Sequence, residues 1–480
     1  MADTIVLYPS PGRSHLVPMV EFGKLILKHD PSFSITIIIS TLPNDVAGDT
    51  SQYISAVSAT TAGITFHHLP AVSDHDLTHY PSIAEVPRLR SILALQNNPN
   101  LHQTLLNLSK TSNVNALVID FFCKPAVQVS SSLKIPAYFF YTSGATALAQ
   151  IIYFPNTFEE TNGLKIDPET FLDIPGLPTV RAKDVFLPDK DGTGRAHKTV
   201  IDIAIQMTRS SGIIINTFET LEQRAFKALK DGKCVPYGEK MPPIYCTGPV
   251  LATGSDQKAE HECLSWLDSQ PTASVVFLCF GSMGFFSTKQ LREMAVGLET
   301  SGFRFLWVVR IPPPGDEFRR TLAVPEPDVE SFLPEGFLKR TKNRGLVVKS
   351  WAPQLAVLNH DSVGGFVNHC GWNSVLEAVC AGVPMLAWPF VAEQAVNRAF
   401  LVEEIKVALA VTVSEEGLVS GSELEKRVTE LMESDNGKAL RERIKGMKEQ
   451  ARLALKEGGC SQVALLSWLS HLKKGRVETS

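Results

Sequence analysis

The chain has 480 residues, of which 44% are hydrophobic and 20% charged, so it is long enough for two domains with separate cores. Its 46 Lys and Arg residues nearly balance 50 Asp and Glu residues, and a net charge of −4 excludes the positive field typical of proteins that bind nucleic acid or anionic lipid. We therefore expect a small molecule as partner.

Targeting and redox signals are absent from the sequence. The eight cysteines form no Cys-x-x-Cys pair, and several lie in apolar runs, which is typical of reduced core thiols. No run of about eighteen apolar residues occurs, and the apolar start Thr4–Tyr8 is too short for a secretory signal. We expect a cytoplasmic monomer without membrane insertion.

The first half of the chain alternates strand-like and helical runs. It begins with a strand at Thr4–Tyr8, a helix at Leu16–Lys28 and a strand at Phe33–Ser40. The later strands are predicted at Ala116–Phe122, Ala137–Tyr141 and Gly212–Thr217. This alternation indicates βαβ units and a parallel sheet, so the fold class is α/β.

His15 is the first candidate for chemistry, because it follows the strand Thr4–Tyr8 across a Pro- and Gly-containing turn. A histidine at the carboxyl end of a strand is well placed to act as a general base, although most isolated loop histidines are simply polar surface. Asp120 closes the apolar strand that starts at Ala116, where a carboxylate is costly without a partner. Asp120 could instead cap the next helix.

A polar, turn-rich passage at residues 251–262 separates the halves, and we place an interdomain linker there. The strand pattern then restarts. Strands are predicted at Val275–Phe280, Phe303–Arg310, Gly345–Lys349, Gly364–Asn368, Met385–Trp388 and Val407–Thr412. The second half is therefore predicted to be a second doubly wound domain, whose ligands lie beyond the carboxyl ends of its strands.

The segment Trp351–Gln394 carries the densest set of functional side chains. A short buried strand leads into His369-Cys370-Gly371-Trp372-Asn373-Ser374 and a helix, and such a junction can hold an anion with free backbone N–H groups. Glu377 follows Ser374 at a capping-box offset, so a helix cap without a ligand is the competing interpretation. Ser282, after the strand Val275–Phe280, could also contact phosphate or simply form a turn.

This segment resembles the nucleotide-sugar signature of plant family 1 UDP-glycosyltransferases, which it matches in order and spacing from end to end. The chain also contains YPSPGRSHLVPMVEFGKLI and ALVIDFFC, which are similar to the N-terminal patterns of members that act on flavonoids and dihydrochalcones. The resemblance implies a GT-B fold with two facing Rossmann-like doubly wound domains and a cleft between them. Ser14 stands where the family usually has Gly.

The resemblance implies the domain bounds as well. The acceptor-binding domain would span residues 1–250 and the UDP-sugar-binding domain residues 263–460, on either side of the linker. Residues 461–480 would form a C-terminal helix that packs back on the first domain.

The same resemblance assigns the donor-binding residues. Trp351 would stack on uracil, Ala352 would bind the base through its backbone, Gln354 would lie near the uridine, and Glu377 would accept the ribose hydroxyls. The diphosphate contacts implied by the family are His369, Asn373 and Ser374. Trp372, Glu393 and Gln394 would contact the sugar, and Gln394 is typical of members that prefer glucose.

The implied reaction is an inverting transfer of glucose from UDP-glucose to a phenolic small molecule, a flavonoid or dihydrochalcone. The family's base matches His15, and the carboxylate that orients it matches Asp120. UDP leaves as a stabilised anion, so we expect no metal and no cofactor beyond the donor substrate. The acceptor pocket is expected to include Phe121, Phe122, Tyr141 and His79, with apolar surface from Pro81–Leu93.

Three alternatives remain open from the sequence. A C-glycosyltransferase acting on an electron-rich ring carbon could use the same base and donor. A sugar-nucleotide-binding protein without catalysis, or an epimerase or phosphorylase, could share the architecture. The acceptor and its regiochemistry are set by loops that leave no motif.

Overall fold

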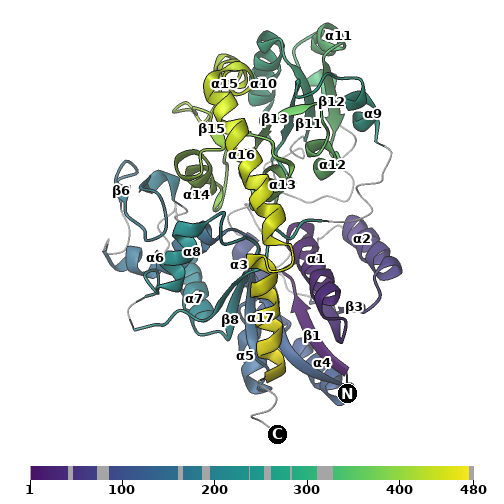
Figure 1. Ribbon diagram of the computed structural model, residues 1–480, viewed down its shortest axis with the longest axis vertical. Coiled ribbons are helices and arrows are strands. Elements are labelled where there is room, and N and C mark those ends of the chain that lie inside the picture. The colour runs from purple at the N-terminus through teal and green to yellow at the C-terminus, as the bar shows by residue number, and fades with distance from the viewer. Residues whose placement is uncertain are drawn as a thin grey trace.

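The computed structural model describes residues 2–41, 47–72, 86–160, 166–185, 195–236, 238–252, 261–281, 284–310 and 328–474. They form two lobes, each built on a parallel sheet with helices on both faces (Figure 1).

The first lobe contains a seven-stranded sheet with the order β3-β2-β1-β4-β5-β8-β9. Its strands are β1 (Ala2–Tyr8), β2 (Phe33–Ile39), β3 (Ile64–His68), β4 (Ser112–Asp120), β5 (Ala137–Tyr141), β8 (Gly212–Ile215) and β9 (Ile244–Cys246). The helices are α1 (Arg13–His29), α2 (Ala47–Thr60), α3 (Val86–Gln96), α4 (Asn98–Thr111), α5 (Ala126–Ser132), α6 (Ala145–Glu160), α7 (Arg195–Thr208) and α8 (Gln223–Lys230). A small antiparallel pair, β6 (Phe171–Leu172) and β7 (Val180–Arg181), lies outside the main sheet.

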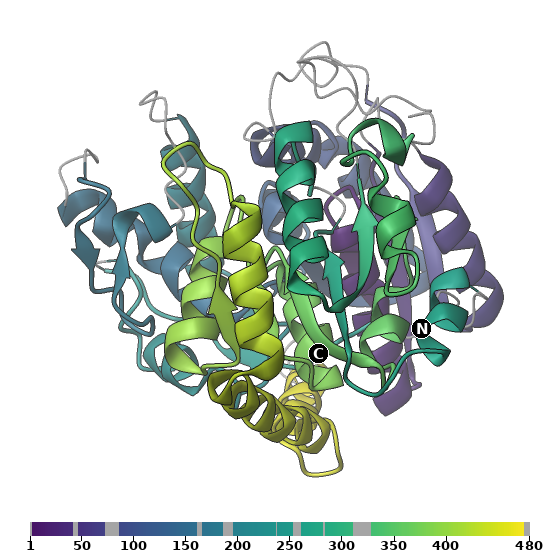
Figure 2. The same ribbon diagram turned by 90° about the horizontal axis from the view of Figure 1, so that it is seen from above.

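The second lobe contains a six-stranded sheet with the order β12-β11-β10-β13-β14-β15. Its strands are β10 (Val275–Cys279), β11 (Arg304–Val309), β12 (Gly345–Lys349), β13 (Val363–Asn368), β14 (Met385–Ala387) and β15 (Ala408–Ala410). The helices are α9 (Glu262–Asp268), α10 (Thr288–Ser301), α11 (Phe337–Thr341), α12 (Gln354–Leu358), α13 (Trp372–Ala381), α14 (Gln394–Ala399), α15 (Gly421–Glu433) and α16 (Asp435–Ala454). Figure 2 looks down on this lobe and shows helices on both sides of its strands.

The strands alternate their side chains between two cores, as a parallel sheet covered on both faces requires. In β1, Ile5 and Leu7 enter one core together with Phe22 of α1, while Val6 and Tyr8 enter the core on the opposite face. All of these side chains are buried. The run of apolar residues in β1 is thus explained by burial on both sides.

The C-terminal helix α17 (Cys460–Lys474) follows α16 from the second lobe down onto the first (Figure 1). Its Trp468 is fully buried, with ring centroids 5.6 Å from Phe22 and 5.6 Å from Tyr138. Leu465 and Leu469 join the same core. Burial of this apolar face stabilises the packing of α17 on the first lobe.

The lobes also exchange apolar side chains. Val396 and Ala399 of α14 belong to the core of the first lobe, and Phe218 and Leu221 of the first lobe belong to the core of the second. Arg398 of α14 forms an ion pair with Asp184, at 2.9 Å. Helix α14 is therefore held by residues of both lobes.

Both sheets reverse their strand order at one point, between β1 and β4 in the first and between β10 and β13 in the second. Loops diverge at such a point and leave space beyond the carboxyl ends of the strands. The predicted site residues His15, Asp120 and His369 follow or end three of these four strands. The fold thus brings the candidate site to the two switch points.

Candidate functional site

His15 lies in the first turn of α1, directly after the turn that leaves β1. Gly12 begins this helix with φ 109°, a backbone conformation that side chains disfavour. Ser14, which replaces the Gly expected from the family, lies inside the helical turn, where any residue fits. Gly12 is therefore the residue whose freedom this turn requires.

Asp120 joins His15 to the end of β4. Its Oδ2 lies 2.8 Å from His15 Nδ1, and its Oδ1 accepts a hydrogen bond from the backbone N–H of Phe122 at 3.0 Å. The carboxylate is 0% exposed, so it depends on these two partners. Asp120 caps the short helix Phe121–Cys123 and binds His15 at once, and that cap ends β4 at Asp120 rather than at Phe122.

Arg90 of α3 lies on the other side of the imidazole, with Nη1 2.7 Å from His15 Nε2. Its guanidinium also lies over the ring of Phe122, 5.2 Å from the centroid. The sequence pattern of Pro81–Leu93 predicted only apolar surface here, so this cation was not expected. No motif marks it, since the contact depends on how α3 packs.

Of the aromatic side chains expected in the acceptor pocket, two contact His15 and a third packs on one of these two. The His15 ring centroid lies 6.1 Å from Phe121 and 5.5 Å from Phe122, and Phe121 lies 5.3 Å from Tyr141. Tyr141 is buried, and burial holds the pKa of its hydroxyl well above the usual value. His79, the fourth expected residue, and Ser282 lie outside the described residues.

His369 follows β13 in the second lobe, packed between two glycines. A Cβ on Gly371 would lie 2.3 Å from His369 Nε2, and one on Gly281 would lie 2.8 Å from Cε1. The described residues provide no hydrogen-bond partner for the buried Nδ1, and burial lowers the pKa of His369 to about 4. A neutral imidazole with an unmet polar atom can therefore bind a ligand here.

Cys370, between His369 and Gly371, has a φ of 61°, which is uncommon for a residue with a side chain. Its N–H donates to Asn368 Oδ1 and its carbonyl accepts from Asn397 Nδ2, at 2.7 and 2.9 Å. These bonds hold the strained turn that starts α13.

Glu377 does not cap α13. Gly371 is the N-cap and contributes no side-chain bond, so Ser374 lies in the first turn and Glu377 beyond it. Gln354 Nε2 instead donates to both Ser374 Oγ and Glu377 Oε2, at 2.9 and 2.6 Å. Burial raises the pKa of Glu377 to about 7. The interpretation of Glu377 as a helix cap is thus excluded. Desolvation destabilises the ionised form of its carboxyl, and hydroxyl groups that donate to it would stabilise that form.

Trp351 and Ala352 precede α12. Trp351 is 44% exposed and forms a T-shaped ring pair with His261, with the centroids 5.8 Å apart, so a flat ligand can stack on its exposed part. Ala352 is buried. Trp351 thus lies at the surface of the same lobe that holds the Gln354 and Glu377 cluster.

Trp372, by contrast, is only 3% exposed and lies at the contact between the lobes. Its Nε1 donates to the backbone oxygen of Asn216 in the first lobe, at 2.7 Å, and its ring lies beside Gly144. The indole therefore joins the lobes, and its contact with a sugar stays a prediction.

Asn373 and Glu393 bring the second lobe close to His15. Asn373 Nδ2 donates to the backbone oxygen of Ser14 at 3.4 Å, so the first turns of α13 and α1 face each other. Ser143 Oγ of the first lobe donates to Glu393 Oε1 at 3.4 Å. Burial raises the pKa of Glu393, and nearby His15 opposes that shift. His15 and Glu393 therefore share one site.

Gln394 begins α14 next to Glu393. Its side-chain Oε1 accepts from the N–H groups of Phe390 and Val391, at 2.9 and 3.1 Å. These bonds fix the orientation of the amide, so a ligand would be met by Nε2 as a donor.

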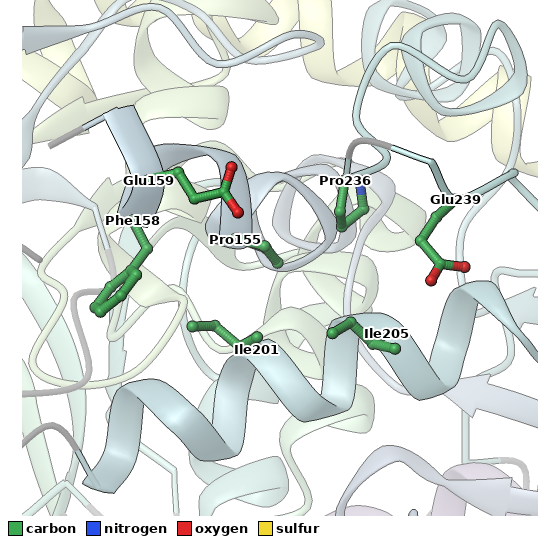
Figure 3. Close-up of a pocket in the computed structure, with 7 residues that line it drawn as sticks. All are labelled: Pro155, Phe158, Glu159, Ile201, Ile205, Pro236 and Glu239. Carbon is green, nitrogen blue, oxygen red and sulfur yellow. The ribbon is translucent and has the colours of Figure 1, made fainter. Parts of the chain in front are cut away.

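A separate cavity of about 340 Å³ lies between α6 and α7 (Figure 3). It is lined by Pro155, Phe158, Glu159, Ile201, Ile205, Pro236 and Glu239. None of the residues predicted for the site belongs to this lining.

Within the described ranges, no group of three or more His, Cys, Asp or Glu residues is placed to hold a metal ion. No helix among those residues has the length and apolar character needed to cross a membrane.

The chain is similar to known proteins over almost its whole length. The model of a family described as UDP-glucoronosyl and UDP-glucosyl transferase matches residues 241–444. Anthocyanidin 5,3-O-glucosyltransferase of a Rosa hybrid cultivar is 48% identical, over 98% of this chain and 99% of its own length. Isoflavone 7-O-glucosyltransferase 1 of Glycine max is 49% identical, over 97% of this chain and 98% of its own length.

Among solved structures, UGT2 of Phytolacca americana complexed with UDP-2fluoro-glucose and pterostilbene is similar to this chain. The two share 35% identity and a TM-score of 0.86, over 98% of this chain and 100% of the other. The likeness confirms the prediction of a GT-B fold.

The half-buried carboxyl of Glu377 gives the first testable prediction. Its pKa of about 7 lies above the ordinary 4.5, so the folded protein binds this proton more tightly than the unfolded chain, and stability falls as pH rises between these values. We expect ligand-free Glu377→Gln to exceed the wild type in stability at about pH 8 by on the order of 1–3 kcal/mol, and to equal it near pH 4.5.

Urea unfolding at both pH values measures the difference. Glu415→Gln, which changes an exposed carboxylate, is the control and should have no effect at either pH. A gain in Glu377→Gln that is the same at both pH values would contradict the buried carboxyl.

Proposed function

The chain belongs to the UDP-glucoronosyl and UDP-glucosyl transferase family and is a UDP-glycosyltransferase, and on this premise we propose that it glucosylates a phenolic hydroxyl of a flavonoid-type acceptor. The donor would be UDP-glucose and the product a β-glucoside. The observation that carries the proposal is the contact of His15 with Asp120 at a site that α13 and Glu393 of the second lobe also reach.

The proposed reaction is a single displacement. The acceptor hydroxyl donates its proton to His15 Nε2 while its oxygen forms a bond to the anomeric carbon of glucose. The bond from that carbon to the diphosphate breaks on the opposite face, and UDP leaves with the electron pair. Asp120 holds the proton on Nδ1 and stabilises the imidazolium that forms.

The donor site would lie on the second lobe. Trp351 offers an exposed face for the uracil, and Ala352 and Gln354 would adjoin the uridine. The ribose hydroxyls would donate to Glu377, which relieves the cost of its burial. These contacts would place the nucleoside along α12 and the middle of α13.

The diphosphate would lie against the start of α13. His369 offers an unmet ring nitrogen, Asn373 and Ser374 offer side-chain donors, and the helix end favours negative charge. Gly371 allows His369 to pack against the start of the helix, because a Cβ there would lie 2.3 Å from His369 Nε2. Since these groups stabilise the leaving anion, we propose that no metal is required.

Glucose would lie at the start of α14, between the diphosphate and His15. Glu393 would accept from its hydroxyls and Gln394 Nε2 would donate to them. Trp372 would contribute to this pocket from the lobe contact. The proposed acceptor pocket is lined by Phe121, Phe122 and Tyr141, whose aromatic surface suits a flat phenol.

We also propose the predicted division into residues 1–250, a linker at 251–262, residues 263–460 and a C-terminal segment 461–480. The two separate sheets and the packing of Trp468 on the first lobe support it. A monomeric state and a cytoplasmic location stay predictions.

The product of the reaction tests the proposal. Incubation with UDP-glucose and a panel of flavonoids, including phloretin and 2-hydroxyflavanones, should give products that lose an intact hexosyl unit in tandem mass spectrometry. The names of the relatives, an anthocyanidin 5,3-O- and an isoflavone 7-O-glucosyltransferase, favour this O-linked outcome. Cross-ring cleavage of the sugar would instead show C-glycosylation, and absence of product with every acceptor would support binding without catalysis.

Substitution of His15 and of Asp120 tests whether His15 is the base. His15→Ala should reduce kcat by about 100- to 10,000-fold, the range that a positioned general base contributes. Asp120→Asn should also lose much activity, because the amide no longer stabilises the imidazolium. The control is His360→Ala, which removes a histidine paired with Asp268 at 3.1 Å outside the site. Near wild-type turnover in His15→Ala, with control and variants equally folded, would reject His15 as the base.

A further inference from the structure

Arg90 determines the state of the base before an acceptor arrives. Its Nη1 lies 2.7 Å from His15 Nε2. Because a guanidinium can only donate, Nε2 must be the acceptor, and the imidazole proton lies on Nδ1, towards Asp120. The contact thus selects the tautomer in which Nε2 can take up a proton.

The guanidinium is held in a defined place. One side lies over the ring of Phe122, whose edge also contacts His15 at 5.5 Å. On another side, a Cβ added to Gly12 would lie 3.2 Å from Arg90 Nη2. The guanidinium of Arg90 therefore lies between Gly12 and Phe122, next to His15 Nε2.

An acceptor hydroxyl and Arg90 compete for the same atom. Nε2 has a single lone pair, so a phenol that donates to it must displace Nη1. The guanidinium still lies over Phe122, and its Nη1 is then beside the place where the phenol oxygen binds.

We propose that Arg90 binds the acceptor oxygen that His15 deprotonates and donates to it as negative charge develops, a role that rests on the proposed function. A charge-assisted hydrogen bond of this kind is strongest when the oxygen carries charge, so it acts on the transition state more than on the bound phenol. The cost of a guanidinium beside the new imidazolium is offset by Asp120 on the far side of the ring. Arg90 would then allow transfer to weakly acidic phenols.

The test compares phenols of similar size and different acidity: para-nitrophenol, para-chlorophenol and para-cresol. In Arg90→Gln, the ratio of kcat/KM for para-cresol to that for para-nitrophenol should fall, by at most about 10- to 100-fold, which is the full size of a hydrogen bond to a charged group. Arg90→Lys should restore part of the ratio. Each ratio is taken within one variant, so loss of folded enzyme cancels.

The matched control is Arg181→Gln, because Arg181 also lies over an aromatic ring of the first lobe, 5.5 Å from the centroid of Phe171. Its ratio should equal that of the wild type. An unchanged ratio in Arg90→Gln, whether the activity is retained or lost equally for all three phenols, would overturn the proposal while the proposed function stands. Absence of transfer by the wild type both to these phenols and to the flavonoid panel would reject both.

Discussion

The burial of one carboxylate governs the first lobe's part of the site. Asp120 is fully buried at the end of β4, where an ionised group without partners is severely destabilising. Its two oxygens are satisfied by the Phe122 backbone and by His15, so the orientation of the imidazole follows from the requirement to pair the carboxylate. Phe122 and Arg90 then take positions set by that ring. The fold thus orients the imidazole of His15, as the proposed role of a base requires.

The position of the second lobe depends on its contacts with the first lobe. Trp372 donates to Asn216, Asn373 donates to Ser14, and the apolar side chains of α14 enter the core of the first lobe. These contacts connect the ends of α13 and α14 to the segment that carries His15. The proposed donor and acceptor sites would therefore be fixed relative to each other by contacts between the lobes, which limits the reorganisation needed for an in-line transfer.

Features that lie at strand ends or in short sequence motifs could be predicted from the sequence. His15 and Asp120 were recognisable because each follows an apolar strand, and two parallel strands with adjacent carboxyl ends bring such groups together. Strand β3, Ile64–His68, was missed because most of its residues are not buried and it lacks a clear apolar run. Arg90 was missed because its contact arises from the packing of a separate helix. The burial of Trp372 was likewise invisible, since it depends on how the lobes meet.

The structure of the protein with UDP and a flavonoid acceptor bound tests the central claim most directly. The account predicts the uracil on Trp351, the diphosphate at the start of α13, and the acceptor oxygen within about 3 Å of His15 Nε2. It also predicts Arg90 displaced from Nε2 onto that oxygen. An acceptor bound instead in the cavity between α6 and α7, or a diphosphate remote from His369, would contradict the account.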